Sequence, residues 1–205
     1  MLELLTGTGL ALSAGLNAYI PLLALGLAGR FLDGVSLPSG WAWLENPWVL
    51  GTLGVLLVIE FVADKIPVVD HINDWLQTVV RPTAGGLAFG SGATATTAAV
   101  ANPEEFFASN QWVTIALGVV IALVVHLAKS AARPMINMAT AGVVTPVVSA
   151  VEDIGSAAVS LVALLLPLLI ILVIPLVVWI IWLIIRRRRK RNGRHPKEPT
   201  VSSNR

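Results

Sequence analysis

At residues 46–82 the chain reads NPWVLGTLGVLLVIEFVADKIPVVDHINDWLQTVVRP, and a related stretch, NQWVTIALGVVIALVVHLAKSAARPMINMATAGVVTP, follows at 110–146. Roughly a third of the aligned positions are identical without a gap, a level that apolar composition alone seldom gives for Trp, Lys and Pro. Identical pairs include Trp48 with Trp112, Lys65 with Lys129, and Pro82 with Pro146. The sequence therefore predicts an internal duplication and a helix bundle with two related halves.

The composition is that of an integral membrane protein. Hydrophobic residues make up 56% of the 205 residues, charged residues make up 13%, and the mean hydropathy is +0.80. A soluble domain carries about 25% charged residues. A chain of this length can form about five or six crossings of roughly 20 apolar residues each, so we expect one all-α membrane domain at 1–185. Cysteine is absent, which removes disulfides, thiolate nucleophiles and cysteine metal ligands.

The apolar runs predict about six membrane segments, some of them re-entrant or interfacial. In chain order the expected pieces are a helix at 7–30, an interfacial loop at 31–47, a helix at 48–66, a re-entrant or interfacial segment at 67–82, a small-residue helix at 83–101, the second copy at 110–148, and a last apolar run at 161–185. The repeat copies then occupy 46–109 and 110–166. The segment 67–82 is too polar to cross alone, and irregular backbone at membrane depth needs protein or water around it.

A basic block, Arg186–Arg191, follows the last apolar run directly. The positive-inside rule places this block in the cytoplasm, where it would meet anionic lipid headgroups. We therefore expect residues 186–205 to form a basic, disordered cytoplasmic tail. The stretch after residue 150 crosses either once or twice, and we favour two crossings joined by a hairpin at Pro167. The copies are parallel if one crossing separates them and inverted if 67–82 also crosses. We favour the parallel arrangement.

Charged residues lie deep within both copies. Glu60 is about twelve residues into its expected helix, roughly 18 Å along the axis, and Asp64 follows one turn later on the same face. In the second copy His126 lies at a comparable depth, and Lys129 and Arg133 continue its helical face. Ionised groups at such depth are costly unless they are paired or hydrated. These residues are therefore the candidates for a polar site between the copies.

Two interpretations of this polar site stay open. In the first, Glu60 binds a proton or cation and His126 titrates with it, while Lys129 and Arg133 bind an anion or gate the path. In the second, the same residues form ion pairs that lock the copies together, since helices in lipid lack the hydrophobic drive that joins soluble helices. In either case Asn17 and the small-residue helix at 83–101 would line or pack the site.

A further group of polar residues, Asp70, Asp74 and Arg81, lies in the expected interfacial segment and forms a candidate interfacial site. Carboxylates could bind a hard cation there, but a solvated face explains the same pattern, so we expect no metal. The sequence contains no G-x-S-x-G, no H-E-x-x-H and no P-loop. An intramembrane enzyme therefore ranks behind a transporter and a structural scaffold, and we expect neither enzymatic activity nor a cofactor.

Three motifs carry a resemblance to a known family: SAGLNAYIPL at 13–22, EFVADKIPVVD at 60–70, and VRPTAG at 80–85. The pattern resembles domain-of-unknown-function family 4126 over about residues 5–165. This resemblance implies a multi-pass protein of the bacterial cytoplasmic (inner) membrane, and it transfers no activity. The positions that it singles out are Glu60, Asp64, Lys65, Pro67, Asp70, Arg81 and Pro82.

The sequence as a whole predicts a polytopic membrane protein that moves a small solute, an ion or a lipid through a polar site between two repeats. The alternative is a non-transporting scaffold, or a subunit of a larger membrane complex, whose buried charges are structural. The expected partners are the bilayer and an unidentified small solute or ion. A homo-oligomer or membrane complex stays open, and nucleic acid is not expected.

Overall fold

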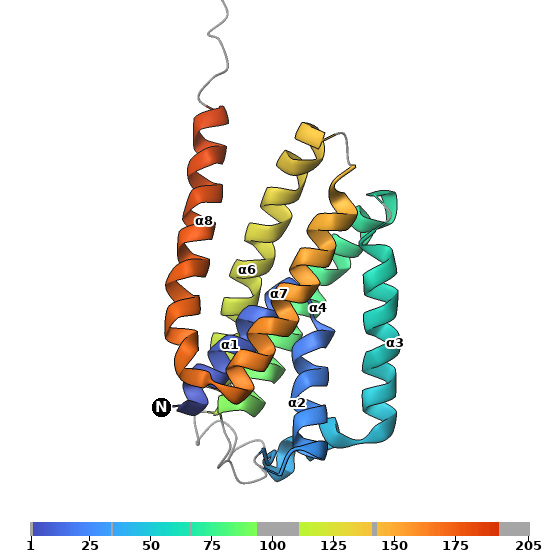
Figure 1. Cartoon of the computed structure of the whole chain (residues 1–205), viewed down its shortest axis with the longest axis vertical. Coiled ribbons are helices and arrows are strands. Elements are labelled where there is room, and N and C mark those ends of the chain that lie inside the picture. The colour runs from blue at the N-terminus through green and yellow to red at the C-terminus, as the bar shows by residue number, and fades with distance from the viewer. Residues whose placement is uncertain (1, 34, 66, 94–110, 141–142, 193–205) are drawn as a thin grey trace, which may run out of the picture.

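The structure, a computed structural model, describes residues 2–33, 35–65, 67–93, 111–140 and 143–192. Its elements are α1 (Leu2–Leu16), α2 (Tyr19–Phe31), the 3-10 helix η1 (Ser39–Glu45), α3 (Pro47–Ala63), α4 (Pro67–Ala93), α6 (Gln111–Thr140), α7 (Thr145–Leu165), the 3-10 helix η2 (Pro167–Leu169) and α8 (Ile170–Asn192). No strand occurs in the described ranges, which confirms the all-helical fold class. The N-terminus and the end of α8 lie at opposite ends of the bundle (Figure 1).

Within the described ranges, three stretches are long and apolar enough to cross a membrane: Trp112–Met138, Thr145–Leu165 and Pro167–Arg187. A fourth span results if η1 and α3, which meet at a 60° bend, are counted together. The chain is therefore a membrane-embedded protein by the length and composition of its helices. The expected count of about six segments is not confirmed, because α1 and α2 are too short and α4 is too polar.

The expected first helix at 7–30 is instead a pair of short helices, α1 and α2, that meet at Asn17. Oδ1 of Asn17 accepts hydrogen bonds from the backbone N–H groups of Tyr19 and Ile20, at 3.0 and 3.2 Å, and so caps α2. Pro21 lacks the N–H that a continuous helix would bond to the carbonyl one turn earlier. Asn17 and Pro21 are the sequence signals for this break, and they outweigh the continuous apolar run that predicts one helix at 7–30.

The α1–α2 hairpin enters the bundle without crossing it. With 15 and 13 residues, its helices are about 22 and 20 Å long, shorter than the roughly 30 Å hydrocarbon core. Both outer ends of the hairpin lie at the same end of the bundle (Figure 1). Its tip residues, Asn17 and Ala18, are completely buried. The α1–α2 hairpin is therefore too short for two full crossings, and its tip lies in the interior of the bundle.

Residues 67–82, expected to be interfacial or re-entrant, and the first part of the expected helix 83–101 form a single helix, α4. The helix continues through Pro82, although this proline removes one backbone hydrogen bond. The separation expected from the change in composition near residue 82 is therefore wrong. Residues 94–101 of the expected small-residue helix lie outside the described ranges.

The two related stretches begin alike and then differ. α3 starts at Pro47 after its N-cap Asn46, and α6 starts at the corresponding place. α3 ends at Ala63, whereas α6 continues through Thr140, because Pro67 disfavours helical conformation in the residue before it and its counterpart is Ala131. Both helices run in the same direction (Figure 1), as the parallel arrangement requires. The duplication itself is not confirmed and stays a sequence prediction.

Small residues allow the central helices to approach closely. A side chain added at Gly85 of α4 would collide with Ala122 of α6, and one added at Gly118 of α6 would collide with the backbone of Gly85. α1 approaches α6 in the same way, since a Cβ at Gly15 would lie 2.7 Å from the backbone oxygen of Ala122. This packing places the Gly-rich part of α4 against α6 and α1 in the interior of the bundle, as close helix packing requires.

The chain after residue 143 forms two helices, α7 and α8, joined at Leu166 and η2. This confirms the favoured hairpin near Pro167, and it brings the basic block to the end of the bundle where α6 finishes (Figure 1). α8 continues through the basic block to Asn192, so residues 186–192 are helical and the expectation of a disordered tail is wrong for them. The remainder of that expected tail, 193–205, lies outside the described ranges.

Candidate functional site

A network of buried charged side chains joins four helices in the interior. Its members, here called the charged network, are Glu60 and the C-cap residue Asp64 of α3, Arg81 of α4, His126, Lys129 and Arg133 of α6, and Glu152 of α7. The side chains of all but Glu152 and His126 are at most 5% exposed, Glu152 is 14% exposed, and His126 is completely buried. The five residues expected from the two copies thus meet in one place.

Arg81 joins the carboxyl groups of Glu60 and Asp64. Its Nη2 lies 2.7 Å from Oε1 of Glu60 and 3.8 Å from Oδ2 of Asp64. The chain reverses after α3, beginning with the turn at 64–65, so that α4 returns alongside and brings Arg81 back to these carboxylates. Arg81 was expected in an interfacial site, but the structure places it at the centre of the charged network.

Asp64 and Glu152 share the two cations of α6. Lys129 Nζ lies 3.5 Å from Oδ2 of Asp64 and 3.0 Å from Oε2 of Glu152. Arg133 Nη2 lies 3.1 Å from Asp64 Oδ2 and 2.8 Å from Glu152 Oε2. Asp64 also accepts a hydrogen bond from Nδ2 of Asn73 at 2.6 Å. The ion pairs therefore connect three carboxylates with three cations, and the linked group is formally neutral.

His126 contacts the network through Arg81. Its Nδ1 lies 3.3 Å from Nη1 of Arg81, and its Nε2 lies 3.1 Å from Oγ1 of Thr78. A guanidinium group can only donate, so Nδ1 must accept and the proton of a neutral ring must lie on Nε2. Nε2 then donates to Thr78, whose hydroxyl donates to the carbonyl of Asp74 at 2.9 Å. Arg81 thus lies between Glu60 and His126, which were expected to be direct partners.

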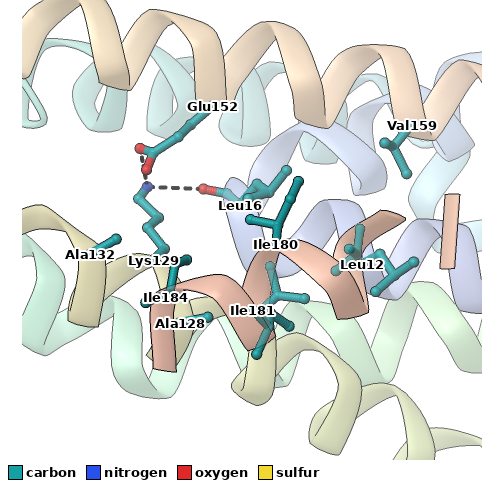
Figure 2. A pocket seen from close by; sticks show the side chains of 12 residues that line it. Leu12, Leu16, Ala128, Lys129, Ala132, Glu152, Val159, Ile180, Ile181 and Ile184 are labelled. Carbon is teal, nitrogen blue, oxygen red and sulfur yellow. Dashed lines mark hydrogen bonds and ion pairs between the residues drawn. The ribbon is translucent and has the colours of Figure 1, made fainter. Parts of the chain in front are cut away.

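The tip of the α1–α2 hairpin contacts the charged network. Lys129 Nζ donates to the carbonyl oxygen of Leu16, the last residue of α1, at 3.1 Å. Figure 2 shows this lysine extended between that carbonyl and the carboxylate of Glu152. Asn17, which was expected to line the site, donates from Nδ2 to Oδ1 of Asp153 at 3.0 Å. The tip therefore supplies a backbone oxygen at the negative end of a helix dipole.

Several buried oxygens around the network lack a hydrogen-bond partner among the described residues. These atoms are Oε2 of Glu60, Oγ of Ser149 and Oδ2 of Asp153. Ser149 lies one turn before Glu152 and Asp153 on α7, so all three occupy one side of that helix. Unpaired polar atoms in an apolar interior are costly, and they mark places where a small polar guest would gain hydrogen bonds.

Some expected polar residues lie outside the network. Lys65, the counterpart of Lys129, folds back on its own helix, where its Nζ bonds to the carbonyl of Phe61 at 3.0 Å. The side chain of Asp70 lies outside the described ranges. Asp74 contributes its backbone carbonyl, and its Oδ1 is buried without a hydrogen-bond partner among described residues. No cluster of three or more metal-binding side chains occurs in the described part of the chain.

Sequence reasoning missed Glu152 as a site residue, and it missed Asn73 and Thr78 as supporting residues. Glu152 opens an apolar run and was read as part of the boundary of that run. A signal was available in the charge count, since the cations Arg81, Lys129 and Arg133 outnumber Glu60 and Asp64, the two carboxylates that share one helical face. A neutral buried network then requires one more acid.

The chain belongs to the family described as domain of unknown function (DUF4126), whose model matches residues 4–187. The match covers the α1–α2 hairpin, every member of the charged network and most of α8. It extends beyond the region 5–165 expected from the motifs. Comparisons with curated proteins and with solved structures find no match.

Proposed function

We propose that this member of the DUF4126 family is a membrane transporter for a small monovalent cation, and that Lys129 occupies the cation site in the present state. The observation that carries this proposal is the oxygen cage around Nζ of Lys129. Asp64 Oδ2, Glu152 Oε2 and the Leu16 carbonyl oxygen lie 3.5, 3.0 and 3.1 Å from that nitrogen. Two carboxylates and a carbonyl are hard oxygen ligands of the type that bind small cations.

The position of the cage supports transport. Secondary transporters place coupling-ion sites where helices are interrupted inside the membrane, and the C-terminal ends of the half-helices contribute carbonyl oxygens. The α1–α2 hairpin is such an interruption, and Leu16 is the C-terminal residue of its first half. Ionisable residues within a membrane segment are costly, and they commonly mark an ion path.

In this mechanism the ammonium group of Lys129 and the transported cation compete for one site. When the Lys129 side chain withdraws, a cation takes its place between Asp64 and Glu152, and the local charge is conserved. Arg133 stays bound to both carboxylates and keeps them in position. The Arg81 and Glu60 pair holds α3 against α4 and does not take part in the exchange. The basic end of α8 orients this end of the bundle toward the cytoplasm.

A non-transporting scaffold is the second candidate function, and the neutrality of the charged network favours it. Three acids and three bases that satisfy one another would hold four helices together without any ligand. Under this alternative Lys129 is only a structural partner of Glu152. Ion flux separates the two functions.

The test uses purified protein in proteoliposomes, with uptake of Na⁺, K⁺ and H⁺ measured separately. We expect the wild-type protein to carry at least one of these ions. Asp64→Asn removes one ligand charge and should reduce that flux by about tenfold or more, equivalent to at least about 1.4 kcal/mol. Lys129→Gln removes the tethered competitor and should lower the cation concentration that gives half-maximal uptake.

Lys65→Gln is the matched control, because Lys65 lies outside the network and bonds only to its own helix turn in the contacts described above. This variant should transport as the wild type does. Absence of wild-type flux for all three ions, from protein whose thermal unfolding shows that it is folded, would favour the scaffold. Equal flux in Asp64→Asn and wild type would exclude the proposed cage.

A further inference from the structure

A partly open apolar cavity lies between α8 and the rest of the bundle. The cavity has a volume of about 230 Å³, and α1, α6, α7 and α8 form its wall. Its lining residues are Leu12, Leu16, Val125, Ala128, Lys129, Ala132, Glu152, Val159, Val177, Ile180, Ile181 and Ile184. Figure 2 shows the α8 isoleucines facing the side chains of α1 and α6 across this space. An apolar cavity of about 150 Å³ is already large enough to bind benzene.

The two charged residues in the lining do not make the cavity polar. Lys129 and Glu152 bind each other at 3.0 Å, and Lys129 also donates to Leu16, so they form a neutral patch at one place in the wall. The other ten lining residues are aliphatic. Water gains few hydrogen bonds in such a space, whereas a hydrocarbon chain gains dispersion contacts on all sides. The shape and chemistry therefore suit an acyl chain.

The cavity-facing side of α8 leads to a cationic surface. Val177, Ile180 and Ile184 follow one another at helical spacing along that side, and Arg187 lies one turn beyond Ile184. Arg186 and Arg187 are both exposed, and the guanidinium of Arg186 lies 5.0 Å from the ring centroid of Trp182. An aromatic ring beside arginines at the end of an apolar helix is typical of the headgroup level of a bilayer.

We propose that this cavity is a binding site for an anionic phospholipid, with one acyl chain between α8 and the bundle and the phosphate at Arg186 and Arg187. The apolar wall and the cationic end occur in the order that such a lipid requires. A second copy of the chain does not fit the same space, since a helix with its side chains is about 10 Å in diameter. The site does not depend on what the charged network transports.

The test is native mass spectrometry of the full chain in detergent, after incubation with either phosphatidylglycerol or phosphatidylcholine carrying identical acyl chains. Val177→Trp places a large side chain in the cavity, and the matched control Val178→Trp places the same side chain on the exposed face of α8. We expect wild type and Val178→Trp to retain phosphatidylglycerol in preference to phosphatidylcholine. Val177→Trp should retain about tenfold less, a change of about 1.4 kcal/mol in binding.

Equal retention by Val177→Trp and Val178→Trp would overturn the acyl-chain site, and equal retention of the two lipids by wild type would overturn the anionic headgroup. The double change Arg186→Gln/Arg187→Gln provides a second line of evidence if Val177→Trp does not fold, because it alters only exposed residues. Loss of the preference for phosphatidylglycerol in this variant supports the site, and an unchanged preference contradicts it.

Discussion

Arg81 is completely buried, and it contacts side chains at the end of α3 and on α6. Its guanidinium binds Glu60 at 2.7 Å and lies 3.8 Å from Asp64, while its Nη1 donates to His126 at 3.3 Å. A planar group with five donors can serve several acceptors in fixed directions, which an ammonium group on a flexible stem cannot do. Arg81 is therefore the residue that links α3, α4 and α6 at the network.

The substitution Arg81→Gln should destabilise the protein strongly. It leaves the buried carboxylate of Glu60 without its cation, and breaking a buried pair by removal of one partner costs about 3–5 kcal/mol. The matched control is Arg30→Gln, because Arg30 is exposed and donates only to the carbonyl of Glu45 in the bonds that are described. Thermal unfolding in detergent measures the difference. An Arg81→Gln protein as stable as Arg30→Gln would show that the pair does not contribute in this way.

Most members of the charged network could be found from the sequence, because a charge inside an apolar run is conspicuous. Which of these residues pair with one another could not be predicted from the sequence. The partner of Glu60 depends on the reversal between α3 and α4, which brings back Arg81, 21 positions later in the chain, and nothing in the spacing of the charges reveals that contact. Glu152 was missed because a carboxylate at the start of an apolar run looks like an ordinary helix boundary.

At the scale of elements, the α1–α2 hairpin differs most from what periodicity suggests. Apolar residues continue from 7 to 30, so composition favours one spanning helix. The break depends on Asn17, which caps α2 and binds Asp153 of α7 at the same time, and on Pro21, which lacks a backbone N–H. In contrast, the start of α3 was predictable, because Asn46 followed by Pro47 is a strong N-terminal signal and Oδ1 of Asn46 does accept from the N–H of Trp48 at 2.9 Å.

α4 packs closely on α6 at Gly85, whereas Gly54 of α3 faces open space, so an added methyl group should change the stability of the protein differently at the two positions. Gly85→Ala inserts a methyl group where Ala122 and the backbone of Gly118 already lie, and overpacking of this kind costs about 1–3 kcal/mol. Gly54→Ala is the matched control, since nothing lies within 4 Å of a Cβ at Gly54 on α3.

The Gly54→Ala variant should be unchanged or more stable, because alanine favours a helix over glycine by up to about 1 kcal/mol. The two melting temperatures, measured side by side in one detergent, provide the comparison. A Gly85→Ala protein that melts with or above Gly54→Ala would contradict the close approach of α4 and α6.

At the scale of the whole molecule, the bundle is asymmetric along its long axis. The charged network lies toward the end that carries the 64–65 turn, the end of α6 and the basic part of α8, while the N-terminus and the tryptophan-containing η1 lie at the other end (Figure 1). This arrangement follows from the α7–α8 hairpin, which the sequence allowed but did not require. Whether the stretch after residue 150 forms one helix or two depends on the turn at Leu166, where Pro167 interrupts an otherwise continuous apolar run.

The proposed transport through the charged network requires that the network open to water. Ser149 reports on this directly, because its side chain is completely buried beside Glu152 and Asp153, serine and cysteine are nearly the same size, and the chain contains no cysteine of its own. Val143→Cys is the positive control, since Val143 is 78% exposed at the same end of the bundle.

The decisive measurement is labelling of Ser149→Cys by a membrane-impermeant thiol reagent in proteoliposomes of known orientation. We expect Ser149→Cys to react more slowly than Val143→Cys but from the same side, and to be protected by the transported cation. A Ser149→Cys protein that stays unlabelled while Val143→Cys reacts completely would mean that the network is permanently closed, and would contradict transport through it.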